Sequence, residues 1–187
     1  MEFQTGDLIL FRTSITPSIW WGLDALISMF TMSPWVHVGI VIRDPEWLGL
    51  KGLYLWESVG FTGMEDAVDK DHKFGVQVVP LHERLQGMHG VHYRTYQGEF
   101  PSEHLEGAYH NTHNKPYDLN LIDWLEAAVR FDLYPQRTRS FWCSALVTYI
   151  LTKSRVLPPL TDWSITPPSY LAWDELPGYG AIKKYNK

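Results

Sequence analysis

The chain has 187 residues, of which 45% are hydrophobic and 14% aromatic, and this size and composition predict one globular domain rather than a disordered chain. The net charge of −5 and the lack of a basic cluster argue against nucleic-acid binding. A single cysteine excludes an intrachain disulfide and a cysteine-rich structural zinc site.

Short apolar segments bounded by turn residues predict strands over much of the first half of the chain. Gly6-Asp7 is a turn signal before the first of them, and Pro17–Phe30 carries a helical apolar stripe with proline near its first turn. Residues 58–74 are rich in Gly, Asp and Lys and predict a loop. The predicted strands are residues 8–11, 35–42, 53–57, 76–79 and 89–94.

Helical segments dominate the second half. They are a short turn at 82–85 and longer helices at 102–112, 121–129 and 140–151. The tail from Pro158 is rich in proline and aromatic residues and is expected to lie over the surface. Strands first and helices late predict an α+β fold, a small antiparallel sheet packed against helices.

The N-terminus and the segment 17–35 decide what we expect of membranes and location. Residues 1–7 lack the charged and apolar regions of a secretory signal, so we expect a cytoplasmic protein or one carried in a virus particle. Residues 17–35 are apolar but interrupted by Asp24 and by Ser and Thr, and they fall short of the roughly 20 apolar residues that span a bilayer. Helix packing, a wall over an acyl-chain site and peripheral membrane contact all remain open for this segment.

Cys143 stands near the start of the apolar helix predicted at 140–151. The positive end of the helix macrodipole favours the thiolate form of a cysteine in that position. A cysteine in apolar surroundings is, however, often only a small buried hydrophobic residue. Nucleophile and packing residue are therefore the two interpretations of Cys143.

His37 interrupts the apolar strand 35–42, and a buried histidine needs a partner. Strand alternation places His37, Gly39 and Val41 on one face, and the wholly apolar opposite face is the better core face. Gly39 would leave room there for another chain or a ligand. Glu57 closes the next strand, and if the two strands pair it could reach His37 and fix the tautomer of the imidazole, while the other ring nitrogen faces Cys143.

These motifs together resemble a known family. Trp35-Val36-His37-Val38-Gly39-Ile40, Glu57 at the end of the following strand and Phe141-Trp142-Cys143-Ser144 are similar to the circularly permuted papain-like fold of the NlpC/P60 superfamily. The nearer relatives are the YiiX-like and YaeF-like bacterial proteins, a poxvirus group and lecithin retinol acyltransferase. Gly6-Asp7-Leu8-Ile9 and Pro116-Tyr117-Asp118 also fit, and the resemblance covers about residues 5–155 of a single domain, with 156–187 as an extension.

The resemblance implies a cysteine-dependent hydrolase or acyltransferase that acts on an amide or ester. Cys143 would be the nucleophile, His37 the base and Glu57 the residue that orients it. Tyr117 matches a tyrosine that precedes the cysteine in relatives and would line the oxyanion site beside the Cys143 N–H. Asp118 is better explained as the N-cap of the helix that follows it. This chemistry needs no cofactor.

The other histidines do not form a metal-binding motif: two pairs are spaced i,i+3, and no HExxH is present. We therefore expect no metal. The substrate would be a small molecule, a lipid or a peptide, and the apolar segment before His37 favours an acyl lipid. The alternative is a non-catalytic binding or structural module that keeps the fold, for example in a virus particle or a lipid-associated assembly. The sequence does not determine the oligomeric state.

Overall fold

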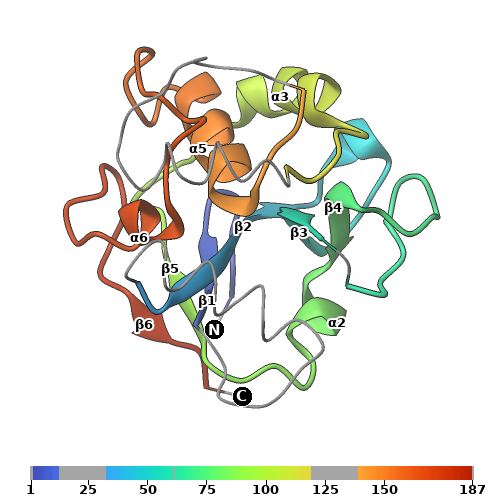
Figure 1. Ribbon diagram of the computed structural model, residues 1–187, viewed down its shortest axis with the longest axis horizontal. Helices are drawn as coiled ribbons and strands as arrows, with labels where there is room; N and C mark the ends of the chain where they lie inside the picture. Colours follow the sequence, from blue (N-terminus) through green and yellow to red (C-terminus); the bar gives the residue numbers. More distant parts are fainter. Residues whose placement is uncertain (1, 13–32, 61, 119–138, 187) are drawn as a thin grey trace.

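The computed structural model describes residues 2–12, 33–60, 62–118 and 139–186. The helices predicted at 17–30 and 121–129 lie outside the described residues. The described part of the chain is a mixed structure of one antiparallel sheet and several helices, in agreement with the predicted α+β class (Figure 1).

The described strands form one six-stranded sheet in the order β4-β3-β2-β1-β5-β6, and every neighbouring pair is antiparallel. The five predicted strands are all present, and β3 continues two residues beyond the predicted end. The strands are β1 (Leu8–Arg12), β2 (Trp35–Arg43), β3 (Leu53–Val59), β4 (Gly75–Pro80), β5 (Val91–Arg94) and β6 (Lys183–Lys184).

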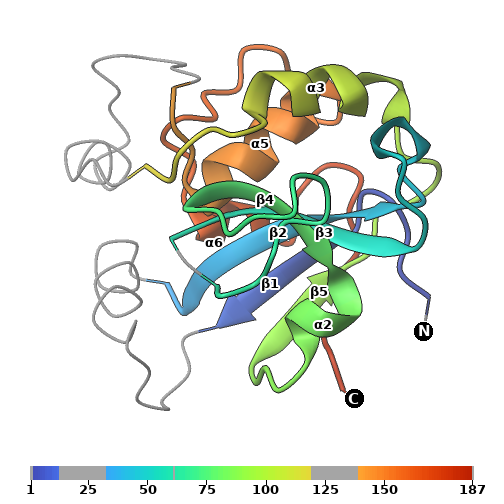
Figure 2. The ribbon, with the colours of Figure 1, turned by 90° about the vertical axis from the view of Figure 1, so that its right-hand side faces the viewer.

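Helices pack on both faces of this sheet. Figure 2 shows α3 and α5 above the strands and α2 below them. The helix predicted at 102–112 divides into a 3-10 turn and α3, and the one predicted at 140–151 begins at Cys143. The bounds are η1 (Glu46–Leu48), α2 (Leu81–Leu85), η2 (Ser102–His104), α3 (Leu105–Thr112), α5 (Cys143–Lys153) and α6 (Pro168–Leu171).

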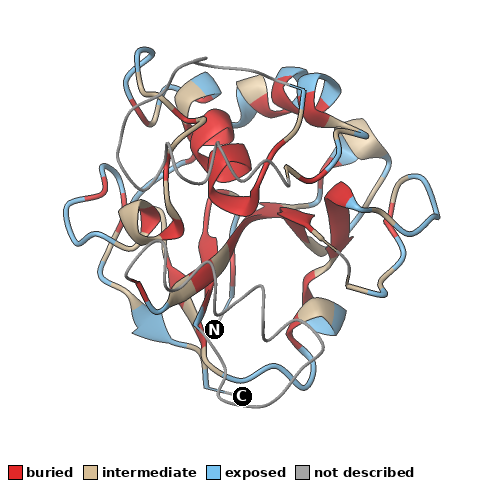
Figure 3. Cartoon of the chain, viewed as in Figure 1, coloured by how far each residue is buried: buried red, intermediate tan, exposed pale blue. Residues whose placement is uncertain are grey.

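Strand alternation sorts the apolar side chains into two cores. Val38 and Ile40 of β2 point to the larger core under α5, whereas Val41 joins a smaller core with Leu81 and Leu85 of α2. All but the last two residues of α5 are buried (Figure 3). The face of β2 that carries His37 is thus a second core face rather than an open one, because α2 covers part of it.

The tail does not lie over the surface as predicted. Trp163, Leu171 and Tyr179 are buried in the larger core, and the chain then returns to the sheet as β6 beside β5. Arg94 of β5, which is fully buried, donates to backbone carbonyls of the tail, among them that of Gly180 at 2.8 Å. The aromatic side chains of the tail bury large apolar areas. This burial outweighs the tendency of the prolines to keep the segment in surface loops.

Within the described segments, no helix has the length and hydropathy needed to cross a bilayer.

Candidate active site

Cys143 is the first residue of α5, the helix that packs against β2 and β3. Trp142 is the extended N-cap, and its carbonyl accepts the first helical hydrogen bond, from the Leu146 N–H, at 3.1 Å. The first amides of a helix have no acceptor within the helix, so the N–H of Cys143 points away from the helix body. The thiol is buried, and its Sγ lies 3.9 Å from the carbonyl oxygen of Val36.

The N-terminal end of α5 meets the sheet near the point where the pairing of β2 with β3 ends. The pairing of β2 with β3 ends at Ile40 and Trp56, although β1 continues beside β2 as far as Trp35. Among the described strands, the stretch of β2 that carries His37 is therefore paired on one side only. Cys143 Sγ meets β2 in this stretch, at the carbonyl of Val36, the residue before His37.

The predicted contact between His37 and Glu57 is present. His37 Nε2 lies 2.6 Å from Glu57 Oε2, and Cys143 is close enough to the imidazole to help raise its pKa. Because Nε2 is engaged by the carboxylate, Nδ1 is the ring nitrogen that remains for the thiol. Glu57 is fully buried, while the His37 side chain keeps 15% of its surface exposed. The structure thus brings three of the predicted site residues into one chain of contacts.

Two further donors hold the other oxygen of Glu57. Arg84 of α2 places its Nε 2.7 Å from Oε1, and the amide nitrogen of Gln77 on β4 donates to the same oxygen at 2.9 Å. Gln77 lies directly opposite Glu57 in the β3–β4 register. The carboxylate therefore has partners from three elements, β2, β4 and α2.

The charges in this cluster support one another. Burial by itself would lower the pKa of His37, but its hydrogen bonds with Cys143 and Glu57 outweigh burial and raise that pKa from 6.5 to about 9. Burial by itself would raise the pKa of Glu57, but the charge of Arg84 and the contact with His37 lower it from 4.5 to about 2. Near neutral pH the cluster therefore holds an imidazolium beside a carboxylate.

Tyr117 lies near Cys143 along the backbone. It is buried, and its backbone forms a parallel bridge with Phe141, two residues before Cys143. Its ring meets that of Phe74 edge to face, with centroids 6.1 Å apart. Asp118 accepts a hydrogen bond from the Ser140 hydroxyl at 2.7 Å, and the helix that it was predicted to cap lies outside the described residues.

The prediction that Gly39 leaves room for another chain or a ligand is wrong. A Cβ at this position would come within 2.8 Å of the Leu55 side chain, so β3 fills the space itself. Position 39 requires glycine because the side chain of Leu55 packs directly against its backbone.

Sequence analysis missed Arg84 and Gln77 as site residues. Arg84 was placed in a short helix and Gln77 in a strand, but neither was given a partner. The available signal was Gln77, a polar residue within an apolar strand whose neighbours in the sheet are buried. Arg84 offered no signal, because only the packing of α2 against β3 brings it to Glu57.

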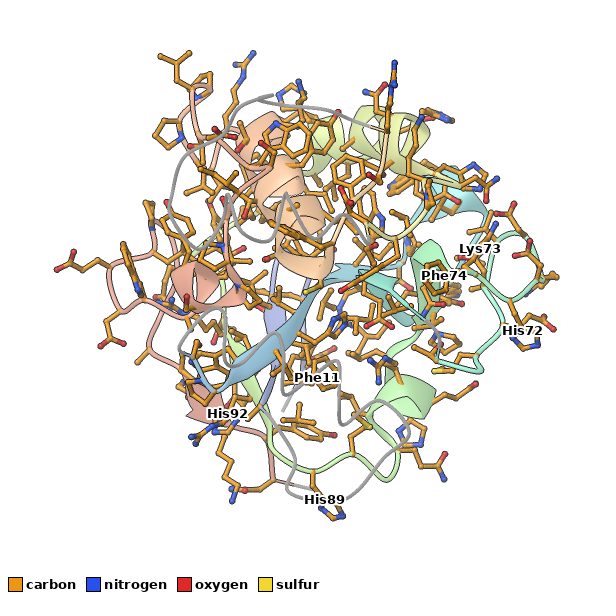
Figure 4. The ribbon with its side chains drawn as sticks, viewed as in Figure 1. Phe11, His72, Lys73, Phe74, His89 and His92 are labelled. Atoms are coloured by element: carbon orange, nitrogen blue, oxygen red, sulfur yellow. The ribbon has the colours of Figure 1, made fainter. Side chains whose placement is uncertain are left out.

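No group of three or more His, Cys, Asp or Glu side chains within the described segments could hold a metal ion. Figure 4 shows His89 and His92 in the lower part of the molecule and His72 at the right, in the connection between β3 and β4. His92 instead packs edge to face against Trp35, with ring centroids 5.1 Å apart.

No protein-family model matches the chain, and no curated protein matches it either.

Proposed function

We propose that this chain is a cysteine-dependent hydrolase or acyltransferase that acts on an amide or an ester. One observation carries the proposal: His37 contacts the buried carboxylate of Glu57 at 2.6 Å, and Cys143, the first residue of α5, lies beside the same strand with its Sγ 3.9 Å from the Val36 carbonyl. A nucleophile, a base and a group that orients the base are the elements of acyl-transfer catalysis.

The chemistry would run in two half-reactions. In the reactive ion pair His37 holds the proton that Sγ of Cys143 has given up, and the thiolate attacks the carbonyl carbon of the substrate to form a C–S bond. The imidazolium gives its proton to the leaving amine or alcohol as the C–N or C–O bond breaks, which leaves a thioester. Water or another acceptor then attacks the thioester, gives its proton to His37 and releases the acyl group with the thiolate.

The oxyanion that forms in each half-reaction needs donors near the sulfur. The N–H of Cys143 at the start of α5 is one candidate, and it lies at the positive end of the helix macrodipole. Tyr117 is the second candidate on grounds of resemblance, and its bridge to Phe141 keeps it close along the backbone.

The order His37, Glu57, Cys143 along an antiparallel sheet that precedes the nucleophile helix is compatible with the permuted papain-like fold of the NlpC/P60 superfamily, which we propose for the chain. An acyl lipid is the substrate class suggested by the apolar segment 17–35, most of which lies outside the described residues. A non-catalytic module would keep the same packing without a reactive thiol.

The rate of iodoacetamide alkylation against pH tests the proposal, because Cys143 is the only thiol in the chain. An ordinary thiol titrates near ~8.5, so only a few per thousand of it is thiolate at about pH 6. A thiolate paired with His37 reacts well below that pH, although its lower basicity makes it a weaker nucleophile. We expect the native protein to react at least about tenfold faster at pH 6 than His37→Ala.

His92→Ala is the matched control, because His92 is another half-buried histidine of the sheet but packs on Trp35. It should react like the native protein. A native thiol that is inert, or that reacts as fast when alanine replaces His37, would refute the catalytic proposal and leave the non-catalytic module.

A further inference from the structure

We infer that Arg84 is a positioning residue of this site: it gives Glu57 a permanent counterion, so that His37 can release its proton without leaving a buried carboxylate unpaired. This inference rests on the proposed function. Arg84 does not contact Cys143 in the structure and would act only through Glu57.

The geometry separates two tasks on one carboxylate. His37 holds Oε2 at 2.6 Å, and Arg84 holds Oε1 at 2.7 Å, so the two cations do not compete for the same oxygen. The Arg84 side chain is 11% exposed. Its guanidinium carbon lies 4.7 Å from the centre of the Phe11 ring, and the same ring is 5.2 Å from the His37 ring. Phe11, a buried residue of β1 that is labelled in Figure 4, thus packs against both side chains.

The proposed chemistry requires this second cation. His37 alternates between imidazolium and neutral imidazole in each half-reaction, whereas Glu57 stays fully buried. A buried carboxylate without a charged partner is strongly unfavourable, so a Glu57 paired with His37 alone would retain the proton on the imidazole. Arg84 keeps its charge at every pH of interest and removes that penalty.

Few other groups around Glu57 carry charge. From β2 it faces His37, from α2 Arg84 and from β4 the neutral amide of Gln77. From α5, Cys143 faces His37 rather than Glu57. Arg84 is therefore the one cation of permanent charge that contacts Glu57 among the described residues.

Loss of this charge has a defined direction. The alkylation rate plotted against pH has an acid limb, where the thiol loses its proton, and an alkaline limb, where the imidazolium loses its proton. Removing a nearby cation makes both groups hold their protons more tightly, so both limbs should move to higher pH. A residue that only packs would lower the rate or the stability at all pH values without moving the limbs.

The experiment is the alkylation profile of Arg84→Gln, which keeps a hydrogen-bond donor but removes the charge. We expect its acid limb to move to higher pH, by less than the roughly 1–3 pH units by which an arginine shifts a carboxylate that it contacts, because Arg84 acts on the thiol only through Glu57 and His37. Arg84→Lys restores the charge and should return the limb towards the native position. Arg12→Met is the control, since Arg12 lies over Trp35 and does not contact Glu57, and it should leave both limbs in place.

Each outcome decides one question. A native profile with an ordinary thiol limb refutes the proposed function, whatever Arg84 does. A native profile with a reactive thiolate that Arg84→Gln leaves unmoved overturns the role of Arg84 and keeps the proposed function. If Arg84→Gln does not fold, adding Glu57→Gln should rescue it, because the defect is then the unpaired carboxylate, and failure of that rescue also overturns the inference.

Discussion

The pair of His37 and Glu57 should make the stability of the fold depend on alkaline pH. The perturbation is a rise from pH 6 to pH 10 in the native protein and in His37→Gln. The pKa of His37 is raised from 6.5 to about 9. The contribution of the imidazolium to the free energy of unfolding is therefore fully present below pH 6.5 and is lost as the pH rises through 9.

The magnitude follows from that shift. One pH unit corresponds to about 1.36 kcal/mol, so a rise from 6.5 to about 9 corresponds to about 3 kcal/mol of unfolding free energy. The His37 side chain is only 15% exposed, so solvent screens little of this effect. The free energy comes from the partners of the imidazolium, which are Glu57 and Cys143.

Urea unfolding at a series of pH values measures this quantity. Other groups titrate in both proteins, so the difference in unfolding free energy between the native protein and His37→Gln isolates the histidine. That difference should be about 3 kcal/mol smaller at pH 10 than at pH 6. A difference that stays constant across this range would show that His37 has an ordinary pKa in the fold and would refute the reasoning from its contacts.

Two further predictions concern packing, each measured by urea unfolding. Gly39→Ala should lose about 1–3 kcal/mol of unfolding free energy, because the new Cβ would come within 2.8 Å of Leu55; a loss below about 0.5 kcal/mol would mean that β3 yields easily. Arg94→Met should lose about 3 kcal/mol and expose the tail to limited proteolysis, because carbonyls including that of Gly180 lose a buried donor. Leu160→Ser is the control for both, since Leu160 is 91% exposed and its loss should change stability by under about 0.5 kcal/mol; native protease resistance in Arg94→Met would contradict the tethering role.

The sequence pattern predicted secondary structure and strand faces correctly wherever these depend on one segment of the chain. The alternation in residues 35–42 correctly separated His37 from the apolar face of β2, and Cys143 does begin a helix. The prediction for the tail failed because Trp163 and Leu171 bury their side chains against elements distant in sequence. Proline and aromatic content describes the chain locally, but packing decides where it lies.

The candidate site shows the same division. The sequence by itself determined which residue types stand on which strand faces, and so that His37 and Glu57 could meet if β2 and β3 paired. Only the tertiary structure decided that the pairing of these strands ends at Ile40 and Trp56 and that the start of α5 lies beside β2, where Cys143 Sγ is 3.9 Å from the Val36 carbonyl. It also decided that Arg84 meets Glu57, because that contact joins residues 27 positions apart on different elements. Side-chain period is a local property of the backbone, whereas a buried charge finds its counterion only when separate elements pack together.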